Sequence, residues 1–148
     1  MAEAMAREDT ECGPRRGYFE HDADVGVFGR GDSIEAAFVA AAESVFDLIT
    51  DISQVRPQER IDVDFEEPDA DLALVIWLNS LLGQASERRL ALGRFELQRR
   101  GTRWVGAAWG EPWREELARG VDVKGATLTQ LAVRSREDGW DARCVVDV

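Results

Sequence analysis

The chain has 148 residues, 45% of them hydrophobic, and a net charge of −11 at neutral pH. A chain of about 150 residues fits one domain and buries enough surface to build its own core. The net negative charge argues against non-specific binding of nucleic acid, because phosphate binding depends on Lys and Arg that displace counterions. The two cysteines, Cys12 and Cys144, are too far apart in sequence to suggest a disulfide framework or a Cys-x-x-Cys pair.

Residues 1–16 are expected to form a flexible N-terminal tail, since they are charged and end near Gly13-Pro14. The folded domain should then span residues 17–148. The tail has no apolar run of the kind found in signal peptides. No segment approaches the roughly 20 apolar residues that a membrane span requires. We therefore expect a cytoplasmic protein that does not bind membranes.

The first half of the domain alternates between strand and helix patterns. Valines separated by small residues predict a strand over residues 24–30. Apolar residues at steps of three and four predict a helix over residues 34–52. Asp32, with Glu35 three residues later, is expected to cap this helix. Strict alternation over residues 61–65 then predicts a half-exposed strand.

The second half begins with a helix and continues with strands. Residues 72–82 are apolar almost all round, which predicts a helix buried on more than one side, and Asp69 and Asp71 suit its positive end. A period of two follows, with turns at Gly101-Thr102 and at residues 137–139. The expected strands contain residues 95–97, 104–109, 117–124, 127–136 and 140–148. The prediction is a single α+β domain, with a largely antiparallel β-sheet packed with two main α-helices.

Several kinds of active site can be set aside. A zinc site usually needs several Cys or His ligands, and the chain has one histidine, His21. There is no Gly-x-Ser-x-Gly elbow for a hydrolase triad and no phosphate-binding P-loop. Six arginines, mostly in the segment after the second helix, are interpreted as the solvated surface of a strand pair, with a local basic patch as the alternative. They are Arg88, Arg89, Arg94, Arg99, Arg100 and Arg103.

A metal site built from carboxylate oxygens is the remaining candidate. Asp22 and Asp24 lie two residues apart, so in an extended segment they point to the same side. Asp147 and the carboxylate of Val148 lie at the end of the chain. Gathered carboxylates repel one another unless a cation lies between them, and calcium or magnesium would suit such ligands. Because the chain has 29 acidic residues, composition alone does not distinguish this group.

Five segments, in order, resemble the motifs of the archease family. The first is Phe-Glu-His-Asp-Ala-Asp-Val-Gly-Val at residues 19–27, similar to the family's Glu-His-Thr-Ala-Asp opening. The other four are Ala36–Phe38 with Phe46–Asp51, Leu74–Leu82, Val123–Thr127, and Asp138–Trp140 with Val145–Val148. The motifs span residues 18–148 in family order, which makes the resemblance far more specific than any single motif.

The resemblance implies a function that composition does not. Archeases assist the RtcB-type RNA ligase of tRNA splicing and RNA repair, promoting its guanylylation and repeated turnover without being ligases themselves. The family's metal site, typically calcium, corresponds here to Asp24, Asp147 and Val148, with magnesium or another divalent cation as alternatives. The resemblance implies that the protein contacts RNA only indirectly, through the ligase. The alternative function is a general chaperone or modulator of RNA-modifying enzymes such as methyltransferases.

The sequence departs from the family pattern in two places. Asp22 replaces the family's Thr, so it adds a carboxylate that either strengthens cation binding or faces solvent. Leu128 and Thr129 replace the Tyr-His that often follows the Val-Lys segment. Lys124 is retained, and either contacts an acidic group of the ligase or its nucleotide, or pairs with a surface carboxylate. His21 is expected to orient other groups rather than to catalyse a reaction.

Overall fold

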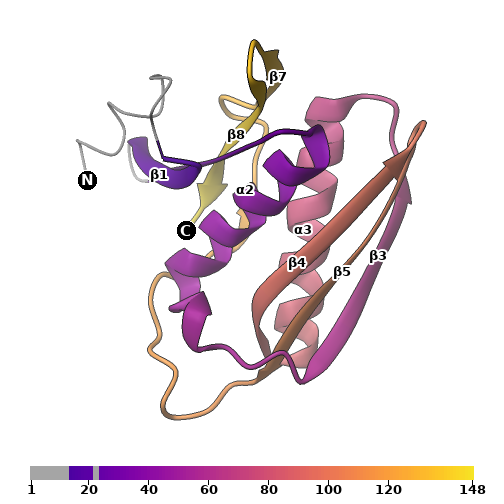
Figure 1. The fold of residues 1–148 in the computed structure, drawn as a ribbon. Helices are drawn as coiled ribbons and strands as arrows, with labels where there is room; N and C mark the ends of the chain where they lie inside the picture. Colours follow the sequence, from indigo (N-terminus) through magenta and orange to yellow (C-terminus); the bar gives the residue numbers. More distant parts are fainter. Residues whose placement is uncertain (1–13, 22–23) are drawn as a thin grey trace.

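The computed structural model describes residues 14–21 and 24–148, and it contains two sheets and two long helices (Figure 1). The helices are α2 (Ile34–Ile49) and α3 (Ala70–Arg88), with a short 3₁₀ turn, η1 (Ile52–Gln54), after α2. The five-stranded sheet contains β1 (Arg16–His21), β2 (Asp24–Gly31), β6 (Gly125–Ala126), β7 (Ala132–Arg136) and β8 (Gly139–Asp147). The three-stranded sheet contains β3 (Glu59–Glu66), β4 (Leu90–Arg100) and β5 (Arg103–Pro112).

All described strand pairings are antiparallel, and the strands divide between two sheets rather than forming one. The larger sheet has the order β1-β2-β8-β6, with β7 also paired to β8, and the smaller has the order β3-β5-β4. Helix α2 packs against β2 and β8 of the larger sheet and against β4 of the smaller one. The α+β prediction with two main helices is confirmed.

Aromatic side chains join the helices to the smaller sheet. Phe38 of α2 stacks on Trp104 of β5, with ring centroids 4.8 Å apart. Trp77 of α3 is fully buried, and its indole N–H donates to the backbone oxygen of Phe38 at 3.0 Å. This contact satisfies the only polar atom of a large buried ring, as buried tryptophans require. The buried residues of α3 form one wide face, and Leu72 on the opposite side is 40% exposed, so the expectation of burial on more than one side is wrong.

Three further local predictions are wrong. The strand expected over residues 127–136 is shorter, since β7 covers only Ala132–Arg136, and residues 127–131 turn where the Thr127 hydroxyl bonds to the Val145 carbonyl. Ser33, not Asp32, is the N-cap of α2: its backbone is extended and its hydroxyl accepts the N–H of Ala36 at 3.1 Å. Residues 117–124 do not form a strand. Their N–H groups instead reach the free carbonyls at the end of α2, through Gly120 to Ile49 at 2.7 Å and through the next residue to Leu48.

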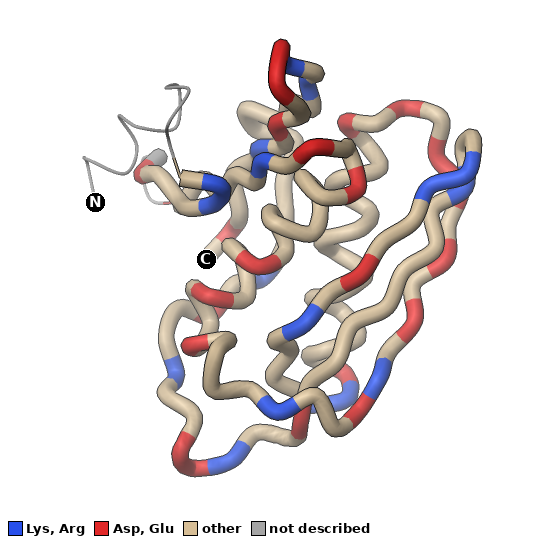
Figure 2. The backbone as a smooth tube through the Cα atoms, viewed as in Figure 1, with Lys and Arg blue, Asp and Glu red and all other residues tan. Residues whose placement is uncertain are grey.

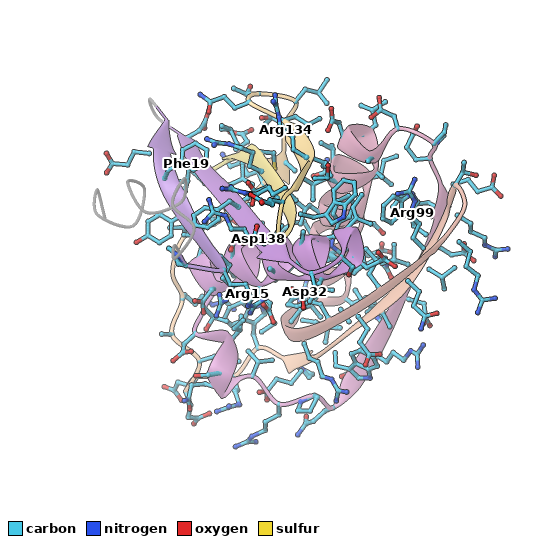
Figure 3. The ribbon with its side chains drawn as sticks, turned by 45° about the horizontal axis from the view of Figure 1, so that its top comes forward. Arg15, Phe19, Asp32, Arg99, Arg134 and Asp138 are labelled. Atoms are coloured by element: carbon cyan, nitrogen blue, oxygen red, sulfur yellow. The ribbon has the colours of Figure 1, made fainter. Side chains whose placement is uncertain are left out.

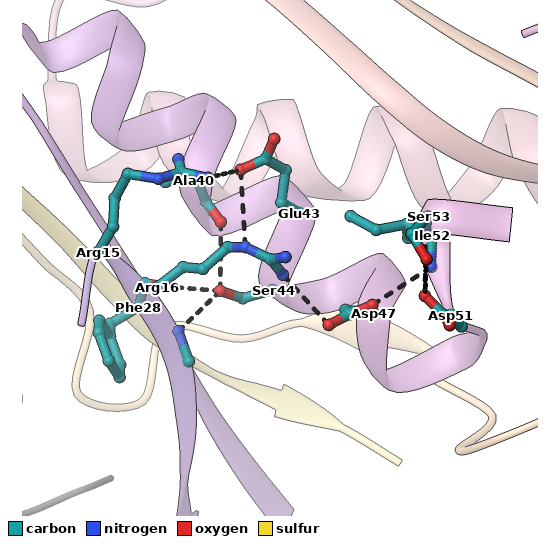
Figure 4. Close-up of polar contacts among 11 residues, drawn as sticks. Arg15, Arg16, Phe28, Ala40, Glu43, Ser44, Asp47, Asp51, Ile52 and Ser53 are labelled. Atoms are coloured by element: carbon teal, nitrogen blue, oxygen red, sulfur yellow. Dashed lines mark hydrogen bonds and ion pairs between the residues drawn. The ribbon is translucent and has the colours of Figure 1, made fainter. Parts of the chain in front are cut away.

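The sequence patterns predict no strand at β1, which begins at Arg16, inside the segment expected to be a tail. Residues 1–13 of that tail lie outside the described residues. Figure 4 shows how α2 holds this strand. The hydroxyl of Ser44 accepts the Gly17 N–H at 3.0 Å and lies 2.8 Å from the Phe28 carbonyl, and Arg16 bonds to Asp47 at 3.3 Å. The buried serine therefore links β1, β2 and α2.

The arginines of the second half are interleaved with carboxylates on the three-stranded sheet (Figure 2). Arg103 pairs with Asp64 at 2.7 Å, and Arg94 lies 3.5 Å from Glu96. Such exposed pairs contribute little to stability, and they reduce the positive charge that the run of arginines presents. No helix in the described part of the chain combines the length and apolar composition that a membrane crossing requires.

Candidate functional site

The sheet register brings the predicted site residues together at one end of the larger sheet. Val25 of β2 lies opposite Val146 of β8, so the next position in the same register places Asp24 opposite Asp147. On the other side of β2, Asp24 is paired with His21 of β1, and Asp147 is paired with Gly125 of β6. The chain therefore aligns these positions in one row across four strands, although those on β1 and β2 lie more than 100 residues from those on β6 and β8.

The alternation of the strands sets the face on which the two carboxylates lie. Val146 is fully buried in the core that contains α2, and Val25 packs against that core. Neighbouring residues of a strand point to opposite faces, so Asp24 and Asp147 are directed to the other face. Asp24 is half-buried and Asp147 is exposed. Neither carboxylate has an ion-pair or hydrogen-bond partner among the described residues.

The main chain around Asp147 is fixed by the short strand β6. The N–H of Lys124 donates to the carbonyl oxygen of Asp147 at 2.8 Å. The Lys124 side chain is exposed and pairs with no carboxylate in the described part of the chain, so the ion pair considered from sequence is not formed there. Val148 is half-buried and directly follows Asp147. Asp147 and Val148 therefore place a side-chain carboxylate and main-chain oxygens next to each other.

Asn79 of α3 attaches β6 to the helix. Its side-chain oxygen accepts the N–H of Ala126 at 2.7 Å, and its amide nitrogen donates to the carbonyl of the same residue at 3.2 Å. The side chain thus makes the two bonds that a neighbouring strand would make. The sequence offers two signals for Asn79: it is a polar residue within an apolar helix, and it lies in the Leu74–Leu82 segment that resembles a family motif.

The donor groups at this end of the sheet are oxygens, which suit a hard divalent cation. Within the described residues, no three His, Cys, Asp or Glu side chains gather closely enough to form a metal site by themselves. Asp24 and Asp147 supply two carboxylates, and the end of the chain supplies further oxygens, which are the ligands that calcium and magnesium take. Asp22 and the side chain of His21 lie outside the described residues. The structure therefore does not test their suggested contributions.

Cys144 is not part of this donor set. It is fully buried in β8, and burial raises the pKa of its thiol to about 12. A thiol that stays protonated at neutral pH is a poor metal ligand and a poor nucleophile. Cys12 lies outside the described residues. The oxygen-based interpretation of the site is therefore the one that the described residues support.

The substituted positions after Lys124 have structural roles of their own. The hydroxyl of Thr127 donates to the Val145 carbonyl at 2.7 Å, and the Thr129 carbonyl accepts the Val145 N–H at 3.1 Å. Leu128 between them is 64% exposed. This segment therefore stays attached to β8 through threonine and backbone groups, and the leucine side chain points to solvent beside the site.

Comparison with known proteins shows a similarity to archeases along the whole domain. The sequence pattern that defines the archease protein family matches residues 17–148. Protein archease of Saccharolobus solfataricus is 35% identical over 134 residues, which cover 88% of this chain and 96% of the relative. Protein archease of Aeropyrum pernix is 31% identical over 137 residues, covering 87% and 94% of the two chains.

Two solved structures have the same fold. The solution structure of protein 1598 from Methanobacterium thermoautotrophicum has a TM-score of 0.76 and 24% identity, covering 90% of this chain and 99% of that one. The crystal structure of an archease from Thermotoga maritima, described as a possible chaperone, has a TM-score of 0.63 and 17% identity, covering 88% and 94%. At these identities, the likeness establishes the arrangement of helices and strands.

Proposed function

Since the chain belongs to the archease family, we propose that it is a non-catalytic, metal-binding accessory protein that activates an RtcB-type RNA ligase by promoting its guanylylation and repeated turnover. The observation that supports the proposal is the register of β2 and β8, in which Val25 pairs with Val146, so that Asp24 and Asp147 are the next positions at the same end of the sheet. Like charges in this position destabilise a sheet, and a cation between them reverses the sign of the interaction.

The proposed ligands are Asp24, Asp147 and the main-chain or terminal oxygen of Val148, with calcium as the expected ion and magnesium or another divalent cation as alternatives. The bound ion would supply positive charge to the acidic end of the sheet. The chain's own residues hold the ligands in place: β6 fixes the Asp147 carbonyl through the Lys124 N–H, and Asn79 fixes β6. Lys124 leaves its ammonium group exposed beside the site, where it is available to an acidic group of the ligase.

The test is multiple-turnover ligation of an RNA with a cleaved phosphodiester by the purified ligase, with GTP and with this protein at substoichiometric amounts. Asp24→Asn and Asp147→Asn keep the size of the side chain and remove its charge. Both variants should lose most of the stimulation, and calcium should raise the melting temperature of the wild type but not of the variants. Asp138→Asn, at the exposed turn between β7 and β8, is the matched control and should stimulate normally.

The proposal fails if both site variants stimulate the ligase as the wild type does. A protein that stimulates no ligase but keeps an RNA methyltransferase soluble would instead support the chaperone function considered from sequence. Retained stimulation with no calcium-dependent change in melting temperature would keep the ligase function and remove the metal from it. Ligation therefore tests the identity of the partner, and the melting temperature tests the binding of the ion.

A further inference from the structure

A cleft of about 1170 Å³ lies beside the proposed metal site. Its walls are the C-terminal half of α3, the start of β4, the end of α2 and the segment over residues 113–124, which connects β5 to β6. Buried apolar side chains form its floor, among them Phe46, Leu82 and Val123. A largely apolar hollow with a few charged groups at its rim is the usual form of a binding site.

The segment that forms one wall is held in place by its own hydrogen bonds. Gly120 and Val121 donate to the carbonyls at the end of α2 at 2.7 and 2.8 Å, and the Thr50 hydroxyl donates to the Ala118 carbonyl at 2.6 Å. At the far end of the segment, Lys124 is fixed to β8 at 2.8 Å. The cleft is therefore formed before any ligand arrives, which lowers the entropy that binding must overcome.

Three cations lie at the rim: Arg89, Arg119 and Lys124. Arg119 lies over the ring of Trp113, 4.0 Å from its centroid. Neither Arg89 nor Lys124 has a carboxylate partner for its side chain within the described residues. This concentration stands out in a chain with a net charge of −11, in which most other described arginines have such partners or cover an aromatic ring.

The backbone at Arg89 supports a role for its side chain. Arg89 is the C-cap of α3 and has φ 55° and ψ 47°, the left-handed conformation. Glycine takes this conformation without the steric cost that a side chain adds, and it is the usual residue at such a position. Arg88 already supplies a cation to the last turn of the helix, so the helix dipole does not require a second one.

We propose that this cleft binds a short acidic segment of a partner protein, with an apolar side chain of that segment seated on the floor and its carboxylates at the three cations. The volume exceeds the roughly 300–1,000 Å³ of small-molecule pockets and suits several residues of peptide. Tryptophan and arginine are the residues most enriched at the centres of protein interfaces. Glu87 and Asp122 also line the cleft, so the carboxylates of the segment are expected to lie at the three cations and away from these two side chains.

The test is a titration of the full ¹⁵N-labelled chain with synthetic peptides, followed by two-dimensional NMR and calorimetry. The probe is a short peptide that alternates Asp or Glu with Leu or Phe, and the counter-probe has Lys at the acidic positions. The acidic peptide should bind weakly and in a salt-dependent manner, and it should shift the amides of cleft residues such as Ser86 and Val123. The titration requires neither a metal ion nor the ligase, so its outcome is independent of the function proposed above.

Arg89→Gly separates a binding role from a structural one, because the two predict opposite signs. The substitution should raise the melting temperature by about 1–3 °C, since it relieves the left-handed backbone, and weaken peptide binding by about two- to fivefold. Lys124→Ala should weaken binding similarly. Arg134→Ala removes the same charge from an exposed position on β7 outside the cleft (Figure 3) and should leave binding unchanged.

Three results would overturn the proposal. The first is an acidic peptide that causes no saturable shifts at the cleft. The second is equal binding of the acidic and basic peptides, or equal binding by the wild type and Arg89→Gly. The third is a single-stranded oligonucleotide that shifts the cleft amides when the acidic peptide does not.

Discussion

Replacing Asn79 with Ala tests whether this side chain secures the strand that borders the proposed metal site. The variant loses two hydrogen bonds to the backbone of Ala126, at 2.7 and 3.2 Å. At about 1 kcal/mol net for each bond, the loss is about 2 kcal/mol, and the better helix propensity of Ala returns about 0.5 kcal/mol. The expected decrease in unfolding free energy is therefore about 1–1.5 kcal/mol, with a melting temperature lower by roughly 3–5 °C.

The assay combines urea denaturation with amide hydrogen exchange. The Ala126 amide loses its acceptor in Asn79→Ala, so its exchange should accelerate more than the global loss of stability explains. Ser80→Ala is the matched control: it makes a similar change at the next helical position and removes only a 3.4 Å contact with Gln84. If Asn79→Ala matches Ser80→Ala in both stability and Ala126 exchange, the attachment of β6 to α3 through this residue is refuted.

Two further predictions concern stability. Glu111 is buried, and its hydrogen bond from Arg114 holds the pKa of its carboxyl below the ordinary value of 4.5, against the effect of burial. A lowered folded-state pKa stabilises the protein above pH 4.5, and this contribution disappears as the pH falls through the folded-state value. Glu111→Gln should therefore reduce the stability difference between pH 7 and pH 3 in urea denaturation, and an unchanged difference would contradict the assignment. Gly29→Ala should destabilise the protein by at least about 1–3 kcal/mol, because the new Cβ would lie 2.2 Å from the backbone nitrogen of Ala41. Gly83→Ala, by contrast, places its Cβ where no atom lies within 4 Å, and it should stabilise α3 by about 1 kcal/mol. Equal melting temperatures for these two variants would show that β2 and α2 can separate at no cost.

Local patterns were sufficient for the elements whose side chains alternate regularly. The helical spacing after residue 34 and the alternation over residues 61–65 correspond to α2 and β3, because the regularly spaced apolar side chains of each element lie in the core. The segment over residues 117–124 has a similar apolar pattern, with Leu117 and Val123 buried, yet it forms no strand. Its backbone hydrogen bonds are taken by the end of α2, a competing partner that no local pattern reveals.

The sequence by itself determined the acidic single domain, the two helices and, through its ordered motifs, the family and the candidate ligands. Only the tertiary structure decided that Asp24 and Asp147 lie opposite each other, because their pairing depends on a register between strands more than 100 residues apart. The structure also assigned Asn79 to β6 and Arg89 to the rim of a cleft. A side chain's contacts with distant backbone are set by how the elements pack, and that packing is a property of the whole chain rather than of any local pattern.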